Sequence, residues 1–195
     1  MSAAEWNFLI ETAATIFGLL CVWLTIRQNI WCWPTGLAMV VLYVYIFWNA
    51  KLYSDMGLQV IYIGLQIYGW WFWLHGGRDR GRAPVRIIPA AWMAGWIGTG
   101  LVGMVLLGTV MSRTTDASLP YWDAATTVLS LIAQWLMGRK VLQSWLFWIA
   151  VDVLAIGIYL VKGLHQTSVL YAVFLVMATL GFFAWRRAMA SGEAI

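Results

Sequence analysis

Seven apolar runs, each about as long as a bilayer is thick, set the first limit on how this chain can fold. A helix needs about 20 mostly apolar residues to cross the hydrocarbon core of a membrane. Of the 195 residues, 63% are hydrophobic and only 10% are charged, which is too little polar surface to cover a soluble domain. We therefore predict an all-α membrane protein, surrounded by the lipid bilayer, with seven transmembrane helices at residues 11–27, 31–48, 53–74, 89–111, 120–138, 145–161 and 165–185. The same composition argues against a soluble enzyme and against nucleic acid as a partner.

The prolines support these boundaries. Pro34, Pro89 and Pro120 fall at the starts of the second, fourth and fifth runs, where a helix does not need the missing N–H group. Pro84 lies in the loop between the third and fourth runs.

Basic residues gather on one side of the predicted membrane, and such an excess marks the cytoplasmic side. We expect a multi-pass protein of the cell inner (plasma) membrane, with its N-terminus outside and its C-terminus in the cytoplasm. The opposite side holds only Lys51, Arg113 and Lys162, whereas the predicted cytoplasmic side holds Arg27, Arg78, Arg80, Arg82, Arg86, Arg139, Lys140, Arg186 and Arg187.

An internal repeat relates the first three runs to the last three. A shift of about 112 residues aligns them without a gap, which is the weak internal symmetry typical of transporters. The aligned pairs include Glu11 with Asp123, Trp23 with Trp135, Arg27 with Arg139, Trp33 with Trp145, Gly69 with Gly181 and Trp73 with Trp185.

The repeat predicts a single membrane domain over residues 1–195 with a 3+1+3 architecture. Residues 11–74 form the first three-helix repeat, 89–111 a connector helix and 120–187 the second repeat. Because one extra span separates the two units, they run in the same direction and are parallel repeats. A substrate is then expected near the bilayer midplane, between the two bundles.

The connector has a stripe of small residues at four-residue intervals: Ala91, Gly95, Thr99 and Gly103. Such a stripe is typical of close helix packing or of an oligomer interface.

Sequence signatures of catalysis are absent: there is no GxSxG, HExxH or Walker motif. The histidines, His75 and His165, lie at opposite membrane faces in this topology, so they cannot share a site. We expect no enzyme, no catalytic residue, no metal site and no cofactor, although a non-transporting membrane enzyme or scaffold stays open as an alternative.

Two polar or aromatic stripes lie inside the predicted spans, where such side chains are costly and usually functional. Gln59, Tyr62 and Gln66 share one face of the third span. The sixth span repeats the spacing with Trp145, Trp148 and Asp152, the acid that lies well inside a span. The plainer alternatives are bonds between helices, interfacial Trp anchors and an Asp152 paired with a Thr or Tyr.

Together these six residues form the predicted substrate-binding site. Aromatic faces stack on rings and attract cations, glutamines donate and accept hydrogen bonds, and a buried carboxylate suits a positive charge. The pattern favours a small aromatic solute with hydrogen-bonding arms, such as a vitamin or nucleoside, over a sugar or an inorganic ion.

Three stretches resemble the PnuC family of nicotinamide riboside transporters. The stretch QVIYIGLQIYGWWFW at residues 59–73 resembles the family's Q-x6-N-I-Y-G-W motif. The residues YWD at 121–123 and RKVLQSWLFWIAVD at 139–152 resemble F-W-D and R-K-x-x-E-N-W-x-x-W-x-x-x-N. The opening ETAATIFGLLCVWL at 11–24 is similar to the family's E-x-x-x-T-x-x-G-L-x-x-x-x-L start.

The resemblance implies a seven-span, 3+1+3 fold related to the SWEET sugar transporters. It also implies facilitated diffusion of nicotinamide riboside into the cell for NAD precursor uptake, a homo-oligomer, and coupling to a cytoplasmic vitamin kinase that traps the substrate. Relatives that carry thiamine or riboflavin supply the alternatives.

Three departures from the family pattern fall where substrate contact is expected by resemblance. Gln66 and Asp152 each stand where the motifs have Asn, and Gln143–Ser144 stand in place of Glu-Asn. Nicotinamide riboside and thiamine both hold a cationic ring that Asp152 would suit, whereas riboflavin is neutral and larger. We therefore place nicotinamide riboside first and thiamine second.

Overall fold

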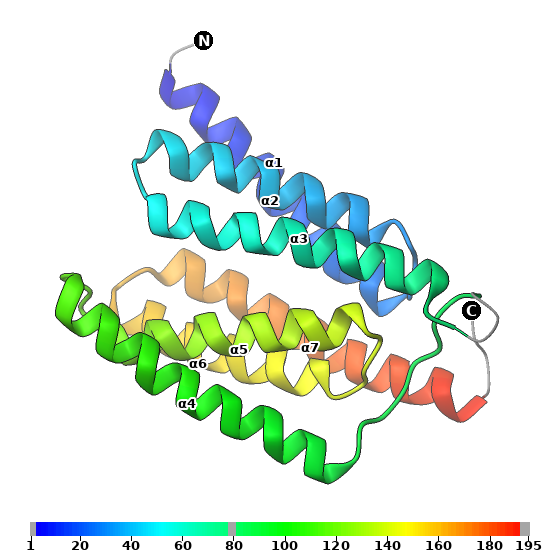
Figure 1. Ribbon diagram of the computed structural model, residues 1–195. Helices are drawn as coiled ribbons and strands as arrows, with labels where there is room; N and C mark the ends of the chain where they lie inside the picture. Colours follow the sequence, from blue (N-terminus) through cyan, green and yellow to red (C-terminus); the bar gives the residue numbers. More distant parts are fainter. Residues whose placement is uncertain (1–2, 78–80, 192–195) are drawn as a thin grey trace. The chain divides into compact units, whose positions relative to one another are not determined.

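The computed structural model describes residues 3–77 and 81–191, and these residues form seven α-helices (Figure 1). Arg78 and Arg80 of the basic cluster lie outside the described residues. The helices are α1 (Ala3–Ile26), α2 (Cys32–Asn49), α3 (Tyr53–His75), α4 (Ala90–Thr114), α5 (Pro120–Gly138), α6 (Ser144–Val161) and α7 (His165–Ser191).

All seven predicted spans are confirmed as helices, and two of them are longer than the apolar pattern indicated. The helix α1 begins at Ala3 rather than near residue 11, and α7 continues to Ser191 rather than 185. The added turns include Glu5, Arg186 and Arg187, so they extend each helix past its apolar part. Pro89 and Pro120 stand at the starts of α4 and α5, as predicted.

Five of the helices in the described chain are long and apolar enough to cross a membrane: α1, α2, α4, α6 and α7. The helices α3 and α5 fall short of that measure. Gln59 and Gln66 lie on α3, and Ser130 and Gln134 are buried on α5. These polar side chains lower the hydropathy of α3 and α5.

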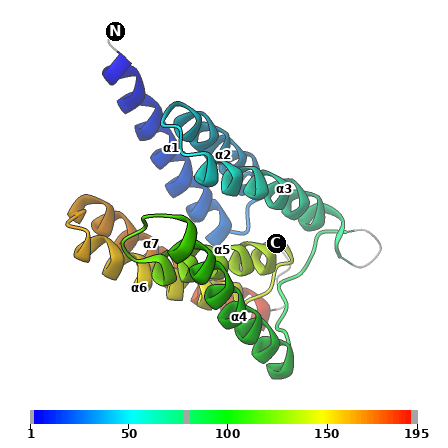
Figure 2. The same ribbon diagram turned by 60° about the vertical axis from the view of Figure 1, so that its left-hand side comes forward.

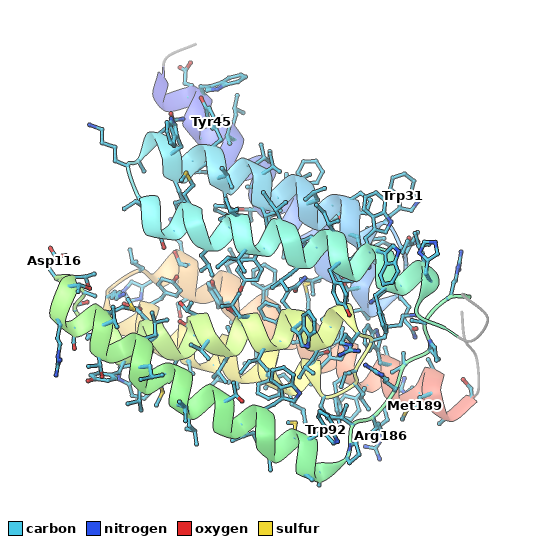
Figure 3. The ribbon with its side chains drawn as sticks, in the orientation of Figure 1. Trp31, Tyr45, Trp92, Asp116, Arg186 and Met189 are labelled. Carbon is cyan, nitrogen blue, oxygen red and sulfur yellow. The ribbon has the colours of Figure 1, made fainter. Side chains whose placement is uncertain are left out.

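Several tryptophans near helix ends are exposed, as expected of interfacial anchors. Figure 3 shows Trp31 at the turn between α1 and α2, and Trp92 in the first turn of α4. Their side chains are 65% and 68% exposed.

The chain divides into two compact units at Ala83–Pro84. In the first unit, α2 packs against both α1 and α3. In the second unit, α6 packs in the same way against α5 and α7, and α4 packs along α5 (Figure 2). The connector helix therefore belongs to the second unit.

A tryptophan pair stands at the same place in both units. The rings of Trp33 and Trp73 meet edge to face, with centroids 5.3 Å apart and planes at 85°. Trp145 and Trp185 repeat this contact at 5.4 Å and 87°. All four side chains are at most 2% exposed, so each pair lies in the core of its bundle.

A glycine makes each pair possible. A Cβ atom at Gly69 would overlap the Trp33 ring, and one at Gly181 would lie within 2.7 Å of three ring atoms of Trp145. The α2 and α6 tryptophans therefore lie directly against the backbones of α3 and α7.

The turns repeat as well. Gln28 and Lys140 both have positive φ, at 53° and 52°. The amide of Asn29 donates to Leu24 O at 2.9 Å, and that of Val141 donates to Leu136 O at 3.0 Å. Arg27 lies over Trp23 at 5.0 Å, and Arg139 lies over Trp135 at 5.5 Å. The repeat read from the sequence is therefore present in the backbone and in the side chains.

The packing of α4 differs in part from the predicted stripe. Contact with α5 is made at Gly100, Gly103 and Gly108, whose missing side chains leave room for Leu129, Val128 and Tyr121. Of the four residues in the predicted stripe, only Gly103 takes part in this contact with α5. The other three members, Ala91, Gly95 and Thr99, line an open cavity of about 460 Å³ together with Trp92 and Trp96.

We predict that Gly181→Ala lowers the free energy of unfolding by about 1–3 kcal/mol, because the added methyl group overpacks the core against Trp145. Thermal or denaturant unfolding in detergent micelles measures the change. Gly157→Ala is the matched control, since a Cβ there meets nothing within 4 Å. It should leave stability unchanged or raise it by up to about 1 kcal/mol through helix propensity. Equal effects of the two variants would contradict the packing role.

Candidate functional site

The α3 stripe lies on one helix, as predicted. Gln59, Tyr62 and Gln66 are three and four residues apart on α3, so they share a face. Gln59 and Tyr62 are half-buried, and Gln66 is only 5% exposed. The stripe therefore runs from a partly open end to a buried end within the first unit.

Gln66 reaches across its own bundle to α2. A Cβ at Gly36 would overlap the Nε2 atom of Gln66 and would lie 3.0 Å from Cys21 Sγ. Gly36 therefore provides the space that the amide fills. The side-chain amide of Gln66 makes no hydrogen bond within residues 3–77 or 81–191. A buried amide without a partner costs about 1–3 kcal/mol, so a polar ligand or water is expected to supply the bond.

On α6, Trp145 is in the core rather than on an open face. It is 2% exposed, its ring contacts Trp185, and it lies against Gly181. Its indole Nε1 is buried and has no hydrogen-bond partner, and the same holds for Trp33 in the first unit. Because Trp33 makes the same contacts, the packing role of Trp145 belongs to the repeat itself. A substrate role for Trp145 stays a prediction that rests on its free N–H group.

Trp148 lies one turn further along α6 and is half-buried. It packs against the hydrophobic core cluster of the second unit, which consists of Ile132, Ala133, Leu136, Val141 and Phe147. This contact holds the indole against α5 and the turn that precedes α6.

Asp152 is the buried acid of α6, with 4% exposure. Among the described residues its carboxyl group has no hydrogen bond and no ion pair, so the suggested bond to a Thr or Tyr is not formed. Its counterpart in the first unit is Val40, which is 1% exposed. The second unit therefore places a carboxyl group where the first unit has an apolar core residue. An unpaired charge inside a membrane span costs several kcal/mol, which makes such a position a functional candidate.

The two units fill one layer of the bundle in opposite ways. In the first unit, Gln66 of α3 fills the space left by Gly36 of α2. At the equivalent positions of the second unit, Ala178 of α7 is small and Trp148 of α6 is large. The bulky group thus comes from the third helix in one unit and from the second helix in the other. The α3 and α6 stripes belong to different units, and their convergence on one ligand is part of the proposal below.

Sequence reasoning missed two contacts in the second unit. The side chain of Gln143 bonds to the backbone of Ile88, with Nε2 donating to the carbonyl oxygen at 2.8 Å and Oε1 accepting from the amide at 3.2 Å. At the other end of α6, Lys162 forms an ion pair with Asp123 at 3.2 Å. The pairs lie 55 and 39 residues apart in the chain, so no local pattern could reveal them.

Metal-binding groups are not gathered in the described part of the chain, where no cluster of three His, Cys, Asp or Glu residues occurs. His75 ends α3 and His165 begins α7. The arrangement offers chemistry for binding a polar aromatic molecule.

Two repeated three-helix bundles, with buried polar groups on otherwise apolar helices, are the architecture of a multi-pass membrane protein, and internal repeats of this kind are typical of transporters. The model of the nicotinamide mononucleotide transporter family matches residues 8–187, and the chain belongs to this family. The family and its relatives are transporters, not enzymes.

Curated relatives cover most of the chain. The nicotinamide riboside transporter PnuC of Escherichia coli (strain K12) is 28% identical over 201 residues, covering 90% of this chain and 84% of that protein. The riboflavin/roseoflavin transporter RibM of Streptomyces davaonensis is 24% identical, covering 90% of this chain and 83% of that protein. A crystal structure of the vitamin B3 transporter PnuC shares the fold, with a TM-score of 0.75 at 23% identity over 95% of this chain and 83% of that one.

We predict that Asp152→Asn makes the ligand-free protein more stable, by about 1–3 kcal/mol, because it removes an uncompensated buried carboxylate. Unfolding in detergent micelles without substrate measures the change. The matched control is Asp116→Asn, an exposed acid in the loop before α5 (Figure 3), which should change stability by less than about 0.5 kcal/mol. A destabilised Asp152→Asn protein would show that the carboxyl group has a structural partner.

Proposed function

We propose that this protein carries nicotinamide riboside across the cell inner membrane by facilitated diffusion, as a route of NAD precursor uptake. Family membership and the PnuC relatives support this substrate. The observation that carries the proposal within the chain is the unpaired Asp152 carboxyl group in α6. The pyridinium ring of nicotinamide riboside carries a positive charge, which would compensate the negative charge of this carboxylate.

The proposed site combines the residues of the α3 stripe with those of the α6 stripe. The amides of Gln59 and Gln66, with Tyr62, would hydrogen-bond the ribose hydroxyls and the carboxamide. Trp148 would stack on the cationic ring beside Asp152, and the free indole N–H of Trp145 would donate a further bond. Asymmetric stripes in two similar units suit a ligand with a sugar at one end and a charged ring at the other.

The direction of net uptake follows from what happens to the substrate inside the cell. A facilitated carrier only equilibrates its solute across the membrane. We therefore propose that a cytoplasmic vitamin kinase phosphorylates the imported nicotinamide riboside and keeps its free concentration in the cell low. The excess of basic residues supports an N-terminus outside and a C-terminus in the cytoplasm. We further propose a homo-oligomer, with the open face of α4 as the candidate contact.

Riboflavin is a further candidate, because RibM is among the relatives. Its ring is neutral, so Asp152 would gain nothing from it. Thiamine has a cationic ring and would satisfy the same carboxylate.

Purified protein in liposomes should let labelled nicotinamide riboside equilibrate without an ion gradient or ATP. Parallel assays with thiamine and riboflavin compare the three candidates under one condition. Uptake that requires a proton or sodium gradient would reject facilitated diffusion. Transport of riboflavin alone would indicate that the protein is a riboflavin transporter like RibM. Transport of none of the three vitamins would favour a non-transporting scaffold.

Asp152→Asn should weaken binding of nicotinamide riboside by about 1.5–3 kcal/mol, the range for a hydrogen bond to a charged group. A neutral analogue of the same outline, such as the dihydropyridine form, should bind the wild type less tightly and lose little more on substitution. Calorimetry on the two proteins with the two ligands measures the coupling as a double-mutant cycle. Asp116→Asn is again the control. Zero coupling would mean that Asp152 does not sense the charge of the ligand.

A further inference from the structure

The linker between the two units is fixed by hydrogen bonds at Ala83 and again at Arg86–Ile88. Only Pro84 and Val85 lie between these two fixed points. On the first side, the amide of Ala83 donates to Trp73 O at 3.1 Å, and Ala83 is 3% exposed. Trp73 belongs to the core tryptophan pair of the first unit. Ala83 is therefore fixed to the end of α3.

On the second side, residues Arg86–Ile88 bond to the turn between α5 and α6, an arrangement we term the linker clasp. Arg86 pairs with Val141 as an isolated parallel bridge: Arg86 N donates to Lys140 O at 3.0 Å, and Leu142 N donates to Arg86 O at 2.8 Å. The Gln143 amide adds the two bonds to Ile88. Four hydrogen bonds thus fix three residues of linker to the second unit.

The repeat shows that the turn does not need the clasp in order to fold. In the first unit, the turn between α1 and α2 has the same positive φ and the same backbone bonds, such as Cys32 N to Asn29 O at 3.0 Å, matching Ser144 N to Val141 O at 3.1 Å. Trp31, the counterpart of Gln143, is 65% exposed. Within the described residues, no strand-like bridge reaches that turn. The hydrogen bonds of the linker clasp therefore fix the linker, and the turn does not need them in order to form.

We propose that Pro84 and Val85 are the hinge between the two units and that the linker clasp confines the hinge to these two residues. The division of the chain into units falls at Ala83–Pro84, between the two fixed flanks. The inference rests on the proposed transport function, because carriers built from repeats reach alternating access by moving one bundle against the other. Gln143 is then a positioning residue: it fixes the linker and touches no substrate.

Two proline variants test the hinge. Val85→Pro stiffens the hinge, and no backbone hydrogen bond is recorded for the Val85 amide. Ile87→Pro is the matched control: its amide also has no recorded bond, but it lies inside the clasp, where the chain is already fixed. Val85→Pro should lower liposome turnover by about fivefold or more, with the Kd for nicotinamide riboside kept within about twofold. Ile87→Pro should match the wild type in both. Equal turnover of the two variants, or a Kd raised by Val85→Pro, overturns the hinge.

A readout that needs no ligand separates this inference from the proposed function. Spin labels at Lys51→Cys and Gln166→Cys, both exposed, report on one unit each in a background with Cys21 and Cys32 replaced by Ala. The distance distribution between the labels in nanodiscs should narrow with Val85→Pro and stay unchanged with Ile87→Pro. It should broaden with Gln143→Met, which removes the two amide bonds of the clasp. Unchanged distributions in all three overturn the hinge, whatever the protein transports. The predicted changes without any vitamin transport would support the hinge and reject the proposed substrate.

Discussion

Each three-helix unit depends on one contact, a tryptophan pressed edge to face against a second tryptophan across a glycine. Trp33 and Trp73 make it over Gly69, and Trp145 and Trp185 make it over Gly181. In a membrane, apolar helices gain little from burying apolar surface, so close van der Waals packing must hold them together. A large ring against a bare backbone supplies that packing. Because the contact recurs with nearly equal geometry, it sets the spacing of the second and third helices in both units.

The helices and the repeat could be predicted because both follow from residue patterns that can be read directly from the sequence. Apolar runs mark the spans, and coincident Trp, Arg and Gly residues mark the repeat. Helix ends such as Ala3 and Ser191 could not be predicted, since a helix continues past its apolar part without a signal in hydropathy. The small-residue stripe of α4 did not predict the contact with α5 in full, because spacing shows which residues share a face but not which partner faces them. Gly100 and Gly108 contact α5, although only Gly103 belonged to the stripe.

The six site residues remain a prediction from the sequence, and their environments could not be predicted from it. The spacing identified the α3 and α6 stripes correctly as helix faces. It could not show that Trp145 is a core residue or that Gln66 fills the space beside Gly36, because those facts depend on neighbouring helices. The bond between Gln143 and Ile88 was equally hidden, since it joins residues 55 positions apart. Long-range contacts are the part of the site that a single sequence does not record.

The division between shared and unshared features explains how this fold tolerates a costly site. The tryptophan pairs, glycines and turns are the same in both units, and they keep the helices in place. Gln66 and Asp152 lie outside this shared set: their counterparts, Ala178 and Val40, are small or apolar and buried. The stability lost to an unpartnered amide and an unpaired carboxyl group is therefore borne by packing that does not involve them, which is the usual relation between a binding site and its scaffold. The two units differ at these buried polar positions and agree in their packing contacts, so the proposed ligand contacts can change without disturbing the packing that the units share.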